Sequence, residues 1–222
     1  MIITAHGGAL KTGRNTLNFF ETIYDYGVDA IEVDIRLRGD ELVLAHLPHE
    51  ACKKDALTLR YALEYAKNND LFINCDVKAK FMVKKVLALA AEIGVSEQII
   101  FTGSVSRGDL KNLGGGACAY LNKSFFPLAA TPKNAPKIKA IIDKYASKYP
   151  DCKIAGINFN YKLVSDEFAK ACNDCGVRIS TFTVDNPAEI ERIAKLEAID
   201  NITTNIPDKA LSILNREVYI NR

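Results

Sequence analysis

Residues 29–49 read DAIEVDIRLRGDELVLAHLPH, and this stretch decides how the rest of the chain is interpreted. It begins like a buried β-strand over Ala30–Ile35, yet two carboxylates, Glu32 and Asp34, interrupt the apolar run. Alternate side chains of a strand face the same side, so both acids are expected to point into one shared space. Two like charges held together are costly unless a positive group lies between them. The stretch therefore predicts a strand that carries a charged site on one face.

The composition indicates an ordinary globular protein. The chain has 222 residues, 48% of them hydrophobic and 25% charged, which suits one large domain. The net charge of +2 gives no electrostatic reason to expect a nucleic-acid partner. No apolar run approaches the ~18–20 residues of a membrane span, so we expect no stable membrane insertion. Six scattered cysteines and the lack of signal-peptide features favour the cytoplasm, with an exported form still open. The sequence does not indicate an oligomeric state.

Strand-like and helix-like segments alternate along the whole chain. The helix signals include Asn186, which can cap a helix that starts at Pro187, and Gly27, Gly94 and Gly176, each of which follows a predicted helix. The predicted strands are Ile2–Ala5, Ala30–Ile35, Phe72–Asp76, Gln98–Thr102, Ala117–Leu121, Ile154–Asn158, Arg178–Thr183 and Asn201–Thr204. The predicted helices are Thr16–Tyr26, Leu57–Asn68, Lys80–Ile93, Arg107–Leu113, Lys133–Tyr149, Ser165–Cys175, Pro187–Leu196 and Pro207–Leu214.

Eight consecutive βα units predict a closed parallel barrel. An open doubly wound sheet is the alternative, but it usually has fewer strands, and no glycine-rich fingerprint follows the first predicted strand. We therefore predict an α/β protein with a single-domain (β/α)8 barrel over residues 1–222. In such a barrel the chemistry lies at the C-terminal ends of the strands, so polar residues at those ends are candidates for a site.

Three acids and two histidines stand at these predicted strand ends. Glu32, Asp34 and Asp76 form a set of hard oxygen donors that suits Mg²⁺ or Ca²⁺. The alternative is a structural network in which Lys78 and Arg36 neutralise the acids. His6 ends the first predicted strand, and His46 ends a short hairpin-like return after the second.

These residues lie in motifs that resemble the glycerophosphodiester phosphodiesterase family. The first strand and the helix after it, "AHGG" and "RNTLNFF", are similar to the family's His-Arg-Gly and Glu-Asn-Thr. "GVDAIEVDIRLRGDELVLAH" is similar to its Gly-Ala-Asp-x-Ile-Glu-x-Asp segment with the following hairpin. Asp76-Val77-Lys78 stands where the family has Glu-x-Lys, and "GVRISTFTVDNPAEIERI" and "IDNITTNIPD" resemble its C-terminal motifs. The resemblance covers essentially the whole chain.

The resemblance implies a TIM barrel and a metal-dependent hydrolase of small-molecule phosphodiesters. Its products would be an alcohol and a phosphomonoester. By this resemblance, a divalent cation, Mg²⁺ or Ca²⁺, would be held by Glu32, Asp34 and Asp76. His6 and His46 would act as general acid and base, and Lys78 would bind the phosphate. The nucleophile would be water or a neighbouring hydroxyl of the substrate.

The chain departs from the family pattern at several positions. Gly7 replaces the arginine that follows the first histidine, and Arg14 replaces the helix-opening glutamate. Arg14 could bring a guanidinium back to the phosphate, or it could face solvent. Phe182 replaces a tryptophan and is a further candidate for substrate binding, while Asp76 is one methylene shorter than glutamate. Only about a dozen residues separate His46 from the next predicted helix, so the capping insertion that shapes the alcohol pocket is expected to be short.

Three functions remain open at the level of sequence. The first is hydrolysis of a glycerophosphodiester or a related compound. The second is a phospholipase-D-like lyase reaction that expels the alcohol and leaves a cyclic phosphate. The third is a non-catalytic phosphate-binding barrel, which the changes at Gly7 and Arg14 would favour.

Overall fold

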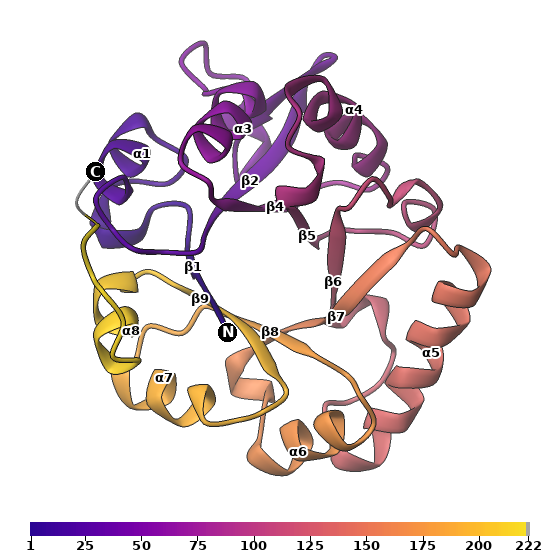
Figure 1. The fold of residues 1–222 in the computed structure, drawn as a ribbon. Helices are drawn as coiled ribbons and strands as arrows, with labels where there is room; N and C mark the ends of the chain where they lie inside the picture. Colours follow the sequence, from indigo (N-terminus) through magenta and orange to yellow (C-terminus); the bar gives the residue numbers. More distant parts are fainter. Residues whose placement is uncertain (221–222) are drawn as a thin grey trace.

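Eight parallel strands close into a barrel in the computed structural model, which describes residues 1–220 (Figure 1). Parallel pairing of the first strand with both the second and the last closes the ring. The single-domain (β/α)8 barrel expected from the sequence is therefore confirmed. The barrel strands are β1 (Ile2–Ala5), β2 (Ala30–Arg38), β4 (Phe72–Val77), β5 (Ile99–Gly103), β6 (Cys118–Asn122), β7 (Lys153–Asn160), β8 (Ile179–Phe182) and β9 (Ile199–Thr204).

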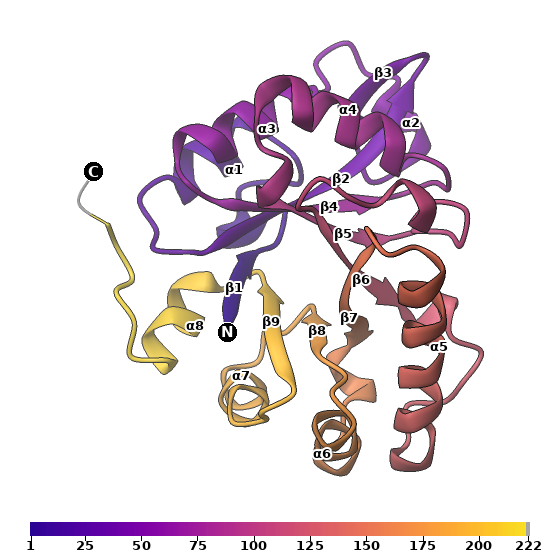
Figure 2. The same ribbon diagram turned by 45° about the vertical axis from the view of Figure 1, so that its right-hand side comes forward.

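A ninth strand lies outside the barrel. β3 (Glu41–Leu44) pairs antiparallel with the end of β2, where Leu44 is opposite Ile35. β2 is longer than predicted because it continues past the barrel to form this hairpin, which projects beside α4 (Figure 2). The hairpin returns the chain to the barrel rim at His46, and the short helix α2 (Pro48–Ala51) follows. The insertion after His46 is therefore short, as expected.

Helices surround the barrel (Figure 1). Side chains of Thr16, Thr58, Ser165 and Asn186 accept main-chain N–H bonds at the helix N-termini, which satisfies groups that have no partner inside the helix. Within residues 1–220, no helix is both long and apolar enough to cross a membrane. The helices not yet given are α1 (Leu17–Ile23), α3 (Leu59–Asn68), α4 (Val83–Ile93), α5 (Ala135–Lys148), α6 (Asp166–Asp174), α7 (Pro187–Ala194) and α8 (Pro207–Ile213).

Two local predictions were wrong. The helix expected over residues 107–113 is only one 3₁₀ turn, Leu110–Asn112, because the segment is short and runs directly into Gly114, Gly115 and Gly116. Gly27 is not among the left-handed residues, unlike Gly94 and Gly176. It is needed for a close approach instead, since a Cβ atom at Gly27 would lie 2.7 Å from the main-chain oxygen of Glu217.

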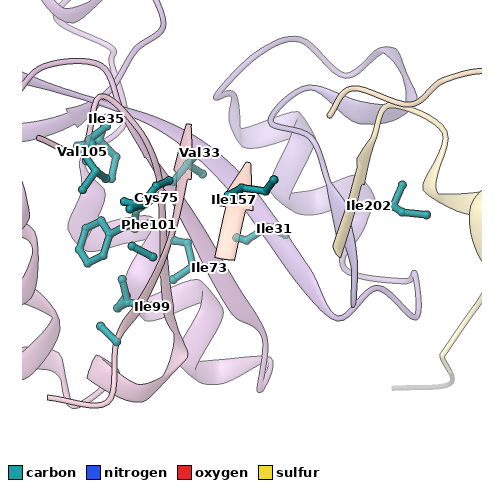
Figure 3. Packing of buried hydrophobic residues seen from close by; sticks show 14 of the residues in the cluster. Ile31, Val33, Ile35, Ile73, Cys75, Ile99, Phe101, Val105, Ile157 and Ile202 are labelled. Carbon is teal, nitrogen blue, oxygen red and sulfur yellow. The ribbon is translucent and has the colours of Figure 1, made fainter. Parts of the chain in front are cut away.

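The hydrophobic core lies between the sheet and the helices. Ile31, Val33 and Ile35 of β2 are fully buried and pack with Ile73 of β4 and Phe101 of β5 (Figure 3). The alternation of a strand then directs the intervening acids of β2 to the inside of the barrel. The outward side chains therefore stabilise the fold, and the inward ones are free to form a site.

The inside of the barrel is polar and hydrogen-bonded. The chain of bonds runs from Thr4 Oγ1 to Asn201 Oδ1 (2.6 Å) and from Asn201 Nδ2 to Ser180 Oγ (2.9 Å). It continues from Ser180 Oγ to Asn158 Oδ1 (2.9 Å) and from Asn158 Nδ2 to Asn122 Oδ1 (2.9 Å). Buried amides and hydroxyls are stable only when paired in this way. The network fixes the strands beneath the candidate site.

Candidate active site

The three carboxylates predicted to share a site lie together at the C-terminal ends of two adjacent strands. β2 and β4 pair in parallel with Asp34 opposite Asp76. Glu32 lies two residues before Asp34 and therefore faces the same side of β2. One carboxylate oxygen from each of the three lies within 4.8 Å of the others. Glu32 and Asp34 are 4% and 1% exposed, so these charges are held away from water. The predicted convergence of the acids is confirmed.

Lys78 supplies the positive charge nearest to these acids. Its Nζ atom lies 2.6 Å from Asp34 Oδ1 and 2.5 Å from Asp76 Oδ2. Among residues 1–220, no lysine or arginine forms an ion pair with Glu32. Its Oε2 atom accepts the main-chain N–H of Gly7 at 2.8 Å. Arg36, the other cation considered in the sequence, donates to the main-chain oxygen of His46 and does not pair with the acids. The ammonium group beside the three carboxylates therefore pairs directly with two of them.

The pKa directions follow from this uneven pairing. Burial raises the pKa of Glu32 well above its usual value, and the charges of Asp34 and Asp76 raise it further. Burial also raises the pKa of Asp76, although Lys78 opposes the shift. Burial acts in the same direction on Asp34, but Lys78 and hydrogen bonds outweigh it and leave the pKa of Asp34 below its usual value. Asp34 is thus the most readily ionised of the three.

The residues present fit a divalent cation. Asp76 Oδ1 is buried and has no hydrogen-bond partner, which is costly unless another ligand satisfies it. The three donors are all carboxylates, the set that Mg²⁺ and Ca²⁺ prefer. A divalent charge would also remove the cost of ionising the two acids whose pKa values are raised.

His6 is oriented by two residues from the last two barrel strands. Its Nδ1 atom lies 2.9 Å from Asn205 Oδ1, and Asn205 Nδ2 donates to Asp185 Oδ2 at 2.8 Å. The Asp185 carboxylate only accepts, so the amide nitrogen of Asn205 must face it and the amide oxygen must face the ring. His6 Nδ1 therefore carries the proton. Nε2, which lies 3.9 Å from Glu32 Oε2, presents its lone pair to the site.

His46 reaches the same site from the end of the β3 hairpin. Its Nδ1 atom lies 3.1 Å from Asp34 Oδ1, which again favours a proton on Nδ1 and a free Nε2. The main chain is held in place because His46 N–H donates to Glu50 Oε2 at 2.9 Å.

Burial lowers the pKa of His6, although the negative charge of Asp34 partly opposes this shift.

Asn15 is a site residue that sequence reasoning did not single out. Its Nδ2 donates to Asp34 Oδ2 at 2.9 Å, and its Oδ1 accepts the main-chain N–H of Asp34 at 3.2 Å. It is buried and adopts a left-handed φ of 56°, a conformation that asparagine tolerates better than most residues. The signal lies in the motif "RNT", in which Asn15 follows the candidate residue Arg14.

The structure explains the glycine at position 7. A Cβ atom there would lie 2.7 Å from the main-chain oxygen of Glu32, so no side chain fits without a shift of the backbone. Arg14 is exposed and lines a separate hollow of about 330 Å³ with Glu50. It does not line the central cavity, although its charge contributes to lowering the pKa of His6.

A cavity of about 60 Å³ lies at the centre of the barrel mouth. His6, Glu32 and Asp76 line it, together with Phe182 at the end of β8. The predicted substrate-binding position of Phe182 thus lies at the site, and Asn74, Thr102, Asn122 and Asn158 form the polar floor.

The barrel is similar to solved structures of phosphodiesterases. A glycerophosphodiester phosphodiesterase from Parabacteroides distasonis matches with a TM-score of 0.73 at 17% identity, over 96% of this chain and 96% of that chain. One from Agrobacterium tumefaciens matches with a TM-score of 0.70 at 18% identity, over 97% and 99%. An Oleispira antarctica phosphodiesterase in complex with the product sn-glycerol-3-phosphate matches with a TM-score of 0.73 at 15% identity, over 97% of both chains. The chain shares the fold of these enzymes. No protein-family model and no curated protein matches its sequence.

Proposed function

We propose that this chain is a metal-dependent phosphodiesterase that hydrolyses glycerophosphodiesters or related phosphodiesters to an alcohol and a phosphomonoester. One observation carries the proposal. Three carboxylates that fit a divalent cation lie beside two imidazoles, and each imidazole has its Nδ1 held by a partner and its Nε2 free. The fold shared with glycerophosphodiester phosphodiesterases supports it.

Glu32, Asp34 and Asp76 would hold Mg²⁺ or Ca²⁺. When bound, such an ion stabilises negative charge on the phosphoryl oxygens and orients the substrate. Lys78 would bind a phosphate oxygen, since its ammonium group is the cation closest to the three acids. Phe182 would contact the alcohol part of the substrate from the wall of the central cavity.

The two histidines would move the protons of the reaction. Burial lowers the pKa of His6 and so favours its neutral form, which can accept a proton from the attacking hydroxyl at Nε2. A bond then forms between the nucleophile oxygen and phosphorus, and the bond to the alcohol oxygen breaks. His46 would act from its imidazolium form, stabilised by the Asp34 carboxylate at Nδ1, and would give its Nε2 proton to the departing alkoxide, which leaves as the neutral alcohol. Asp185 and Asn205 keep the free lone pair of His6 directed at the site.

A product assay tests the proposal against its alternatives. The protein would be incubated with glycerophosphodiesters and either Mg²⁺ or Ca²⁺, and the products followed by phosphorus NMR. A phosphomonoester that forms only with metal supports the hydrolase. A cyclic phosphate would assign the lyase reaction instead, and unchanged substrate that still binds would indicate a non-catalytic phosphate-binding barrel.

A further inference from the structure

A second pocket, of about 480 Å³, opens at the C-terminal face of the barrel beside β4, β5 and β6. Two cationic side chains, Lys80 and Arg107, line it. Three hydroxyl groups join them, those of Ser104, Ser106 and Ser124. The pocket therefore offers ammonium, guanidinium and hydroxyl donors to a single occupant. The mechanism proposed above uses none of these residues.

The charge of this pocket differs from that of the other hollows. The central cavity and the hollow lined by Arg14 each include at least one acidic side chain, and so do two further hollows, one lined by Asp166 and Glu189 and one by Asp185. This pocket has two cations and no acid among its lining residues. Within the described part of the chain, neither Lys80 nor Arg107 forms an ion pair. The two positive charges therefore remain available to a ligand.

The pocket is held in shape by a buried carboxylate. Asp109 is 1% exposed, and its Oδ2 accepts the main-chain N–H groups of Phe81 (3.0 Å) and Ser106 (2.9 Å). It also accepts the Ser106 hydroxyl at 2.5 Å. These bonds join the loop after β4 to the loop after β5, and they hold Phe81 at a φ of 64°, an unusual value for that residue. The guanidinium of Arg107 lies over the ring of Phe125 at 5.8 Å.

One wall of the pocket begins next to the candidate active site. Val77 at the end of β4 pairs with Gly103 at the end of β5, and a Cβ atom at Gly103 would lie 1.9 Å from Asp76 Oδ1. Ser104 is the next residue after this contact, and Lys80 follows Lys78 by two positions. A group attached to a bound phosphodiester could therefore extend from the acids into the pocket.

We propose that this pocket binds a second, anionic group on the alcohol of the diester, namely a phosphomonoester. The proposal rests on the proposed function and adds the class of substrate. A phosphomonoester carries about −1.5 to −2 charges near pH 7 and has three acceptor oxygens. The two cations match that charge, and the guanidinium and the hydroxyls of Ser104 and Ser124 can donate to its oxygens, whereas the Ser106 hydroxyl already donates to Asp109.

The test compares two probes that differ by one phosphate, glycerophosphoinositol and glycerophosphoinositol 4-phosphate. We expect the wild-type protein to have the higher kcat/KM on the phosphorylated probe. The double variant Lys80→Ala, Arg107→Ala should reduce the ratio of the two kcat/KM values about tenfold to a hundredfold, because charge-assisted bonds are lost. Both residues are exposed, and circular dichroism would check that the variant folds. Arg107→Lys should retain part of the ratio.

Lys84→Ala is the matched control, because Lys84 is an exposed cation in α4 that does not line the pocket. It should leave the ratio within about twofold, as for surface charges in general. An equal ratio in wild type and double variant would overturn the proposal. So would activation of glycerophosphoinositol hydrolysis by inorganic phosphate that depends on Lys80 and Arg107, because that result would assign a free effector.

The failure of the proposed function would be recognised separately. If wild-type protein hydrolyses neither probe and none of the glycerophosphodiesters of the product assay with Mg²⁺ or Ca²⁺, the phosphodiesterase assignment fails. Calorimetric titration of the same two probes into wild-type protein and the double variant still tests the pocket. Tighter binding of the phosphorylated probe that is lost in the double variant supports the pocket, and equal binding of both probes refutes it.

Discussion

Asp185 is expected to control the tautomer of His6 although it does not touch the ring. It accepts the side-chain N–H of Asn205, and this bond turns the Asn205 oxygen toward His6 Nδ1. In Asp185→Asn the new amide can donate a hydrogen bond to the Asn205 side-chain oxygen. Rotation of the Asn205 amide by half a turn then becomes favourable. The Asn205 nitrogen would face His6 Nδ1, the proton would move to Nε2, and the acceptor at the site would be lost.

The magnitude follows from the bond that is removed. A hydrogen bond to a charged group contributes about 1.5–3 kcal/mol, and this preference holds Asn205 in the productive orientation. Its loss corresponds to a decrease of about 10- to 150-fold in the productive tautomer and in kcat/KM. That is smaller than, and only at its upper end reaches, the ~10²–10⁴ expected for complete loss of a general base.

Two measurements check this reasoning. Steady-state kinetics on a glycerophosphodiester give the decrease in kcat/KM, and long-range ¹H–¹⁵N spectra identify which nitrogen of His6 is protonated. Asp174→Asn is the control, because Asp174 is an exposed acid on α6 that pairs only with Lys170 among the residues described. A variant at Asp185 with the wild-type nitrogen pattern and the wild-type rate would refute the role assigned to this residue.

Substitutions at three further positions test the site directly. His6→Ala or His46→Ala should each lower kcat by about 10²–10⁴, as for a lost general acid or base, and unchanged turnover in either variant would remove that residue from the mechanism. Arg14→Ala is expected to change kcat and KM by less than about threefold, because Arg14 is exposed and lies outside the central cavity. A tenfold rise in KM that Arg14→Lys does not rescue would show that the guanidinium reaches the phosphate.

The sequence predicted the barrel and the acids well because both depend on short-range regularities. Alternation within β2 is enough to place Glu32 and Asp34 on one face, and parallel strand ends bring Asp76 to the same edge. The amide contacts could not be predicted in this way. Asn15 reaches Asp34 only because its backbone is left-handed, and Asn205 reaches His6 across the closure of the barrel. Such contacts depend on loop conformation, which residue periodicity does not encode.

The boundaries that differ have local physical causes. β2 extends to Arg38 because β3 supplies hydrogen-bond partners beyond the barrel, which the apolar run alone does not indicate. The family pattern has an arginine at the position of Gly7, yet the backbone there lies too close to Glu32 for a side chain to fit without a shift. Its N–H group donates to Glu32, so this carboxylate is paired with a main-chain dipole in place of a charged side chain.

That replacement leaves the acids short of positive charge, and metal binding should therefore release protons. Burial raises the pKa of both Glu32 and Asp76 in the folded protein. The folded, metal-free protein consequently holds protons that the unfolded chain would lose once the pH rises above the ordinary carboxylate range. The stability that these two protonated groups contribute is present at low pH and is lost as the pH rises through their raised pKa values.

A divalent cation requires both groups as carboxylates, so its binding must displace the protons. Titration calorimetry with Mg²⁺ or Ca²⁺ in buffers of different ionisation enthalpy should detect protons released on metal binding, with a release that grows as the pH is lowered. Glu32→Gln should weaken metal binding and reduce the release, whereas heats that are identical in all buffers would contradict the raised pKa values.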